Sequence, residues 1–189
     1  MARPRFHDPV AVLSALPHWC QYRAVVLAAV APAQRLMNWH DERPESEQRP
    51  YSATWRPVLA SIWSFAAGDD QSWYPISHAL GHYYLSPLSH VEGQDGPDDG
   101  DQDEVAAAIF AANAVLHGLP GFAELAAGRA LDAIDNRWFG IDDRRRNAEK
   151  QEELQRQRST LQLITGAARD RNTWRTGAPA DLIAAIRCL

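Results

Sequence analysis

Two histidines in the middle of the chain have the spacing of a metal-binding pair. His78 and His82 are four residues apart, so a helix would present both imidazoles on one face, where they can bind one metal ion. A zinc peptidase would need a glutamate directly after the first histidine, where this chain has Ala79, and no spacing specifies His90 as a third ligand. We therefore expect a partly buried helix surface here and no cofactor, with a metal-dependent enzyme as an alternative.

An acidic run follows, from Glu92 to Glu104. It contains seven carboxylates and three glycines but no lysine or arginine, and its apolar surface is too small to offset the entropy lost on ordering. The run does not match a calcium-binding EF-hand loop, because Glu104 stands where that loop needs glycine. We predict a mobile loop over 92–104. If the protein is a binding module, four of its carboxylates, Asp98, Asp99, Asp101 and Asp103, should attract a basic protein partner; the alternative is that they only keep the protein soluble.

Other patterns that could support catalysis are weak. The sequence lacks the G-x-S-x-G motif of serine hydrolases, and Cys20 lies in an apolar stripe, where a cysteine is more often a small core residue. The segment Asp142–Arg146 could bind phosphate. Its two acids followed by arginines are better explained as the start of a helix, whose dipole favours negative charge there. We therefore predict no catalytic residues.

The chain has seven tryptophans, which is many for 189 residues. Four of them fall on predicted apolar helix stripes, namely Trp19, Trp55, Trp63 and Trp138. The other three, Trp39, Trp73 and Trp174, lie in or beside polar segments. Exposed aromatic side chains often anchor protein interfaces, so these three are candidate partner-binding residues. They can equally fold over helix ends as part of the core, and the sequence leaves both readings open.

Composition limits the class of protein. An apolar content of 46% over 189 residues fits a single domain with a substantial core. The net charge of −5 argues against nucleic-acid and membrane partners, which usually bind a cationic excess. Cys20 and Cys188 lack metal-type spacing, and the N-terminus has no secretion-signal pattern, so we expect a cytoplasmic protein. Nothing in the sequence sets its oligomeric state.

The strongest structural signal is a helical hairpin over Asp103–Phe139. Its first arm has an apolar stripe at helical spacing, and its second arm has one formed by Ala127, Leu131, Ile134 and Trp138. Between the arms, a glycine and a proline in His117–Gly121 end the first helix and let the second return antiparallel. We predict that this hairpin is the buried centre of the fold and that Leu131 and Ile134 of its second arm are core residues.

Further helices are predicted on both sides of this hairpin. No stretch alternates with period two over a convincing length, so the whole chain, 1–189, is predicted to be an all-α, single-domain bundle of about six to eight helices. Pro32 should kink or split the second helix, and the polar segment His40–Pro50 should be a linker. The remaining helices are expected from Asp8-Pro9, from Pro17, at Ser52–Ala67, at Asp142–Gly166 and from Pro179. Ser72–Leu88 is less regular and contains a candidate short helix between Pro75 and Pro87, and the sequence leaves open whether this central segment is helical.

Two segments in the second half carry a family resemblance. DEVAAAIFAANAVLHG continuing to ALDAIDNRW, and then NAEKQEELQRQRSTLQLI, resemble the second half of the YjaG-like family of small bacterial helical proteins of unknown function. The shared features are an acidic start at Asp103-Glu104, an alanine-rich helix, the run Ala133–Asp135 and a Gln151–Leu154 pattern with Gln157. The resemblance implies an all-helical fold and no catalytic residues at numbered positions.

The sequence does not specify a reaction or a ligand, but it supports three hypotheses. The first is a non-enzymatic helical protein-binding module, such as an immunity or adaptor protein that occludes a basic partner. The second is a metal-dependent enzyme built on His78 and His82. The third is an enzyme or ligand carrier whose site is assembled from residues far apart in the sequence.

Overall fold

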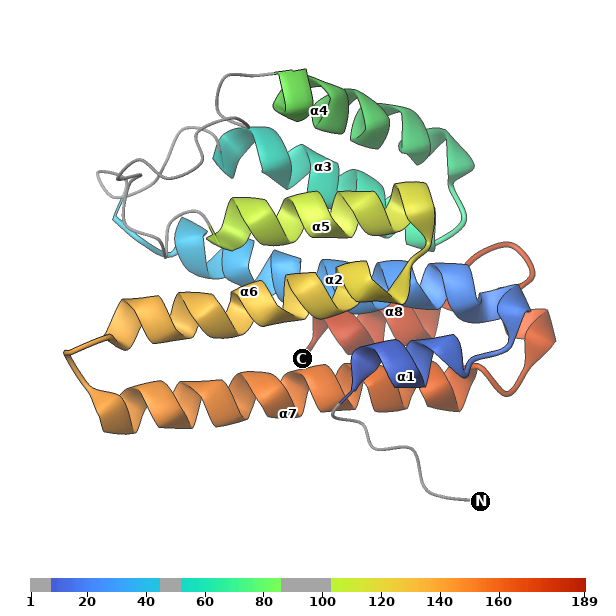
Figure 1. The fold of residues 1–189 in the computed structure, drawn as a ribbon. Helices are drawn as coiled ribbons and strands as arrows, with labels where there is room; N and C mark the ends of the chain where they lie inside the picture. The colour runs from blue at the N-terminus through green and yellow to red at the C-terminus, as the bar shows by residue number, and fades with distance from the viewer. Residues whose placement is uncertain (1–7, 45–51, 86–102) are drawn as a thin grey trace.

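The chain folds as an all-α bundle. The computed structural model describes residues 8–44, 52–85 and 103–189, and within these ranges it contains eight α-helices and no strand. The helices are α1 (Pro9–Ser14), α2 (His18–Asp41), α3 (Ser52–Ala66), α4 (Trp73–Leu85), α5 (Asp103–His117), α6 (Pro120–Trp138), α7 (Asp143–Ala167) and α8 (Ala180–Arg187), with short 3-10 turns η2 (Asp70–Ser72) and η5 (Arg171–Trp174) (Figure 1).

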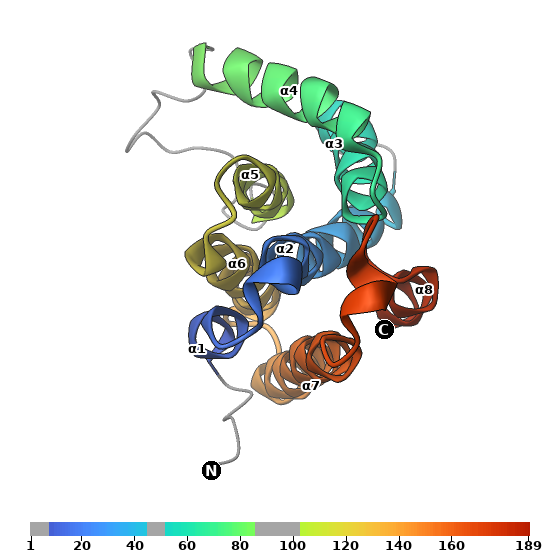
Figure 2. The same ribbon diagram turned by 90° about the vertical axis from the view of Figure 1, so that its right-hand side faces the viewer.

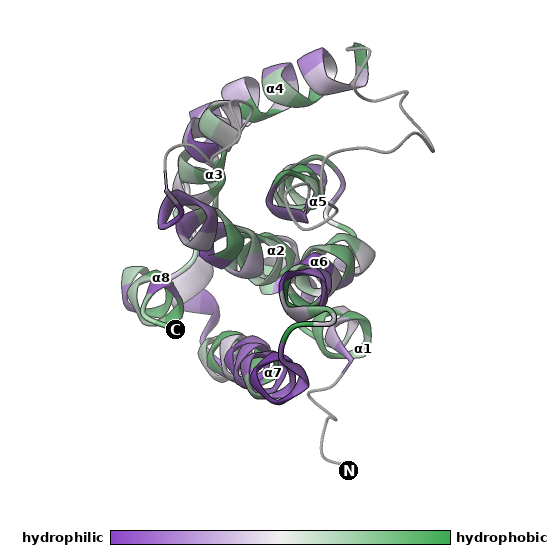
Figure 3. Ribbon diagram, turned by 90° about the vertical axis from the view of Figure 1, so that its left-hand side faces the viewer, coloured by the Kyte–Doolittle hydropathy of each residue, from purple (hydrophilic) through white to green (hydrophobic). Residues whose placement is uncertain are grey.

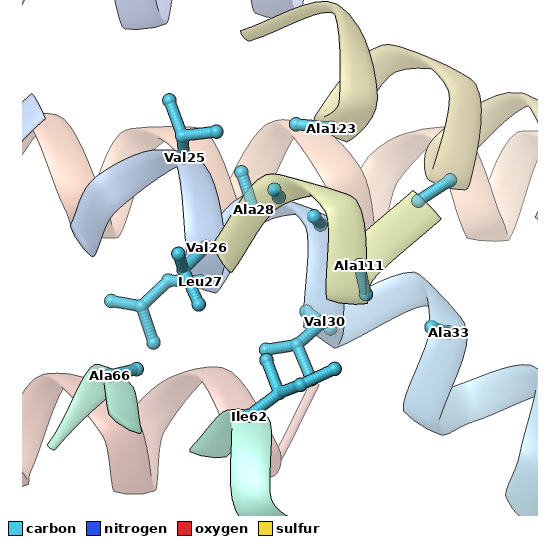
Figure 4. Close-up of a cluster of buried hydrophobic side chains, with 14 of the residues drawn as sticks. Val25, Val26, Leu27, Ala28, Val30, Ala33, Ile62, Ala66, Ala111 and Ala123 are labelled. Carbon is cyan, nitrogen blue, oxygen red and sulfur yellow. The ribbon is translucent and has the colours of Figure 1, made fainter. Parts of the chain in front are cut away.

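Helix α2 lies at the centre of the bundle. Figure 2 shows it end-on, with α1, α6, α5, α3, α8 and α7 around it. Every residue from Ala24 to Ala33 is buried, as expected for a helix that is apolar on all sides. Pro32 lies inside one continuous helix, so the expected split does not occur; the surrounding helices outweigh the local preference. Figure 4 shows α2 side chains packed with Ile62 and Ala66 of α3, Ala111 of α5 and Ala123 of α6.

The predicted hairpin is present as α5 and α6, which run antiparallel to each other and both pack on α2 (Figure 1). Gly118 has φ +64, a left-handed conformation that ends α5, and Pro120 begins α6. The buried face of α6 differs from the predicted one. It is a row of small side chains, Ala123, Ala126, Ala127, Ala130 and Ala133. Leu131 and Ile134 are only half-buried, so their prediction as core residues was wrong.

Close packing explains this difference. Alanine has the smallest side chain that still favours a helix, so an alanine face lets two backbones approach closely. The larger side chains of α6 then lie at the edge of the contact. Ile134, for example, lines a surface pocket together with residues of α2 and α7.

Helix α4 covers one side of the bundle. A turn after α3 redirects the chain, and Gly68 has φ +109 there. The Asp69 carboxylate accepts hydrogen bonds from the backbone N–H of Gln71 at 3.1 Å and from the Ser72 hydroxyl at 2.7 Å. Helix α4 then packs on α3 and α5 at the outer edge of the fold (Figures 1 and 2). Its two fully buried side chains are Ile76 and Leu80.

Helix α7 is as polar as its sequence predicted. Asp142 caps its first turn, accepting a hydrogen bond from the Arg145 amide at 2.9 Å, and the predicted Arg145–Glu149 ion pair is present at 3.1 Å. Figure 3 shows this helix largely in the hydrophilic colour. It is anchored by the buried Leu161 and Ile164 and by a two-hydrogen-bond ion pair from Arg35 of α2 to Glu153.

Substitution of Ala126 tests the close packing of α2, α5 and α6. Ala126→Leu should lower the free energy of unfolding by about 1–3 kcal/mol, because the larger side chain must separate the backbones or adopt a strained rotamer. Ala148→Leu, on the exposed side of α7, is the matched control and should stay within about 0.5 kcal/mol of the parent. Equal stability of the two variants in urea denaturation would show that Ala126 does not lie in a tight helix contact.

Candidate binding pocket between α4, α5 and α6

A pocket of about 710 Å³ lies between α4, α5 and α6. Three other pockets formed by described residues are smaller, at about 80, 280 and 400 Å³. The lining of the large pocket combines aromatic rings, carboxylates and one guanidinium. Its residues are Tyr83, Tyr84, Asp103, Ala106, Ile109, Phe110, Arg129, Asp132, Asp135 and Asn136.

Asp103 forms the floor of this pocket at the start of α5. Its side chain is 2% exposed, and its two oxygens accept hydrogen bonds from the Arg129 guanidinium and the Asn136 amide, both at 3.2 Å. The prediction that Asp103 is a solvated loop residue was therefore wrong. Glu104 is also buried, so the acidic loop cannot extend to 104. Asp98, Asp99 and Asp101 lie outside the described residues.

Burial dominates the electrostatics of Asp103. Loss of water around the carboxylate raises the pKa of Asp103 above the ordinary 3.8, while the hydrogen bond and positive charge of Arg129 act in the opposite direction. The nearby Asp132 carboxylate adds to the increase, and the hydrogen bond from Asn136 lowers it. A carboxylate that is costly to ionise, placed in a pocket, is a common feature of ligand sites.

A second buried polar group contacts the residue that follows Asp103. His40, near the end of α2, is fully buried, and its Nε2 lies 3.6 Å from Oε1 of Glu104, which is also fully buried. The segment His40–Pro50 was predicted to be a linker, which is wrong for His40 and Asp41, because α2 continues through both. Burial lowers the pKa of His40, and its hydrogen bond with Asp41 opposes that change. This contact joins the end of α2 to the start of α5, which fixes the position of Asp103.

The carboxylates on α6 differ in exposure and pairing. Asp135 forms an ion pair with Lys150 of α7, and its Oδ1 lies 3.8 Å from Nε of Arg146. The Asp132 side chain is 58% exposed, and its Oδ2 lies 3.8 Å from Nη1 of Arg129. Asp132 is therefore the lining carboxylate that a ligand can reach most directly.

Tyrosines form the α4 side of the pocket. The rings of Tyr83 and Tyr84 meet edge to face with centroids 5.4 Å apart, and the Asn113 amide donates to the Tyr84 hydroxyl at 3.1 Å. Phe110 supplies a third ring from α5. Carboxylates beside aromatic rings suit a cationic group, which is attracted both by the negative charge and by the ring faces.

Most of this pocket was not predicted from the sequence. One available signal was the spacing of Arg129, Asp132 and Asn136, which places three polar side chains on one stripe of α6 beside its alanine face. The acidic start of α5 could then have been matched to Arg129. No sequence pattern identified the two tyrosines as pocket residues.

The three candidate interface tryptophans have different environments. Trp174 is buried, and its indole donates to the Ala167 carbonyl at 3.0 Å, so of the two readings left open for it the core reading is confirmed and the surface-anchor reading is wrong. Trp39 is half-buried and contacts the guanidinium groups of Arg43 and Arg137, whose central carbons lie 4.0 and 4.7 Å from its ring centroid. Trp73 is 47% exposed at the start of α4.

The histidine pair lies on α4 as the spacing predicted. The rings of His78 and His82 have centroids 4.6 Å apart. Both side chains are exposed, so the expectation of partial burial was wrong. Among the described residues no group of three histidine, cysteine, aspartate or glutamate side chains could hold a metal ion, and His90 lies outside them. Cys20, by contrast, is a buried core residue as predicted.

Comparison of the chain with protein-family models, with curated proteins and with solved structures finds no match. The resemblance of the second half to the YjaG-like family therefore stays a prediction. In the part of the chain that the structure describes, no helix combines the length and apolar character needed to cross a lipid bilayer.

The raised pKa of Asp103 gives a pH-dependent prediction. The folded protein holds the Asp103 proton more tightly than the unfolded chain, so the stability associated with the protonated form is present at low pH and lost as the pH rises through the raised pKa. An asparagine side chain at this position cannot ionise. Relative to the parent, the variant Asp103→Asn should therefore gain stability as the pH rises from about 4 to about 7.

Urea denaturation across this pH range measures the effect. Asp132→Asn removes an exposed carboxylate from the same pocket and controls for the loss of one negative charge. The burial argument would be contradicted if the difference in unfolding free energy between Asp103→Asn and the parent stayed constant with pH. It would also be contradicted if the parent gained stability relative to the variant as the pH rose.

Proposed function

We propose that this protein is a non-enzymatic binding module, of the immunity or adaptor type, that engages a basic protein partner. The observation that carries the proposal is the pocket between α4, α5 and α6, where tyrosine rings lie beside aspartates. Of its three carboxylates, Asp103 is hydrogen-bonded to Arg129 and Asp135 is paired with Lys150, so Asp132, whose side chain is 58% exposed, is the one most available to a cation. A lysine or arginine side chain of the partner would enter the pocket beside Asp132 and contact the ring of Tyr84.

The sequence around the pocket supports the same partner. The chain that joins α4 to α5, residues 86–102, carries five carboxylates and no lysine or arginine, and Asp103 follows it directly. Negative charge concentrated near a binding site accelerates association with a positively charged surface. Tyrosine is also enriched among the residues that dominate binding energy at protein interfaces.

The described lining residues also support binding over nucleophilic catalysis. They include no serine, cysteine or histidine, so the pairing of a serine or cysteine nucleophile with a histidine base is not formed by these residues. An enzyme or ligand carrier remains the alternative, and the feature that favours it is Asp103, whose raised pKa suits a proton donor. A metal-dependent enzyme would need ligands in addition to His78 and His82. We place the protein in the cytoplasm, which its two unpaired cysteines support.

Small cationic probes test the pocket without a known partner. In heteronuclear NMR titrations, N-acetyl-arginine methylamide and its lysine counterpart should shift the backbone amide signals of pocket residues, and added salt should weaken the effect. The double variant Tyr84→Ala/Asp132→Asn should bind the probes about tenfold more weakly or worse, because it removes a ring and the accessible carboxylate.

A matched control removes the same kinds of side chain elsewhere. Tyr74→Ala/Asp181→Asn takes an exposed tyrosine from the outer face of α4 and an exposed aspartate from α8, and it should bind as the parent does. Probe shifts that spread evenly over the surface, or that survive the pocket substitutions, would rule out this pocket as the cation site.

A further inference from the structure

The outer face of α4 carries the histidine pair and is separate from the pocket. His78 and His82 project away from the buried Ile76 and Leu80, and their ring centroids lie 4.6 Å apart. Tyr74, 69% exposed, stacks on His78 with a centroid distance of 6.3 Å. Leu85, 87% exposed, follows at the end of the same face. Nothing in the proposed cation pocket uses these side chains.

This pair can supply two of the four ligands of a zinc site. Two imidazoles four residues apart on a helix can bind one ion, and zinc in proteins is usually bound by four ligands in a tetrahedron. Within residues 8–44, 52–85 and 103–189 no third histidine, cysteine or carboxylate joins the pair in one metal-binding group. A zinc ion bound here therefore needs further ligands that the described residues of one chain do not supply.

The geometry points to a second copy of this chain as the source of those ligands. Two α4 helices related by a twofold axis would each supply His78 and His82, which gives four imidazoles around one Zn²⁺ on the axis. Each imidazole binds the ion through a neutral ring nitrogen, and zinc undergoes no redox change. The protein would then be a zinc-bridged dimer, a property that does not depend on the proposed cation pocket.

The surface around the histidines suits close approach of a second helix. Gly81 lies beside them on the exposed side, and a Cβ built on it would meet no atom within 4 Å. Helix α4 contains no lysine, arginine, aspartate or glutamate, so two copies of it bring no like formal charges together. Tyr74 and Leu85 would bury apolar surface on either side of the metal.

The size of this face explains why the metal would be required. A helix of 13 residues offers a face of roughly 20 by 10 Å. A stable protein interface normally buries about 800 Å² on each partner, which is several times larger. Contacts along α4 are therefore insufficient alone, and dimerisation should depend on zinc.

Sedimentation of the untagged 189-residue chain tests the proposal. The mass should double from 21.1 kDa when half an equivalent of zinc sulfate is added, and a chelator should reverse the change. Magnesium should not replace zinc, because it prefers oxygen ligands. His78→Ala and His82→Ala should each abolish the doubling. His18→Ala removes another exposed histidine, on α2, and should leave the doubling intact.

Three outcomes would overturn the zinc-bridged dimer. They are a monomer at all zinc concentrations, binding of one zinc per monomer without association, and zinc-induced association that survives both histidine substitutions. Circular dichroism of the variants shows whether they are folded, and their exposed positions predict that they are. The pocket variant Tyr84→Ala/Asp132→Asn should still dimerise with zinc, so failure of one proposal is distinguishable from failure of the other.

Discussion

Close packing of α2, α5 and α6 through small side chains is the constraint on which the rest of the structure depends. Buried alanines on α5 and α6 face a central stretch of α2 that is itself buried on every side. Each alanine removes little apolar area from water, so this contact gains stability from many closely spaced atoms and not from a few large side chains. The larger residues are consequently placed around it, in the contacts with α3, α4 and α7.

The polar groups of the pocket follow from this arrangement. Because the alanine face of α6 is turned to the core, its polar stripe with Arg129, Asp132 and Asn136 is turned toward the start of α5. Asp103 is costly to bury, and its hydrogen bonds from two α6 side chains offset part of that cost. The His40–Glu104 contact holds the same end of α5 to α2. The pocket is therefore built on two helices that pack closely on each other and on the central helix α2.

The helices could be predicted from sequence because each depends on local signals. Apolar periodicity, the Asp142 cap and the Gly118-to-Pro120 turn act within a few residues, and they placed the helices and the hairpin. The choice between two faces of α6 depends on partners far away in the sequence, so the stripe through Leu131 and Ile134 was misleading. Asp103 resembles its acidic neighbours in composition, and only the distant Arg129 and Asn136 distinguish it.

Helix α4 carries both candidate surfaces, and it is also the helix with a small share in the core. Two of its side chains are buried, and it packs at the edge of the bundle, on α3, η2 and α5. Elements with few buried contacts open or shift at a lower free-energy cost than the core helices do. The tyrosine side of the pocket can thus adjust to a ligand while Asp103 and the polar stripe of α6 stay in place. A position at the edge also leaves the histidine face of α4 open to a second helix without disturbing the packing of α2, α5 and α6.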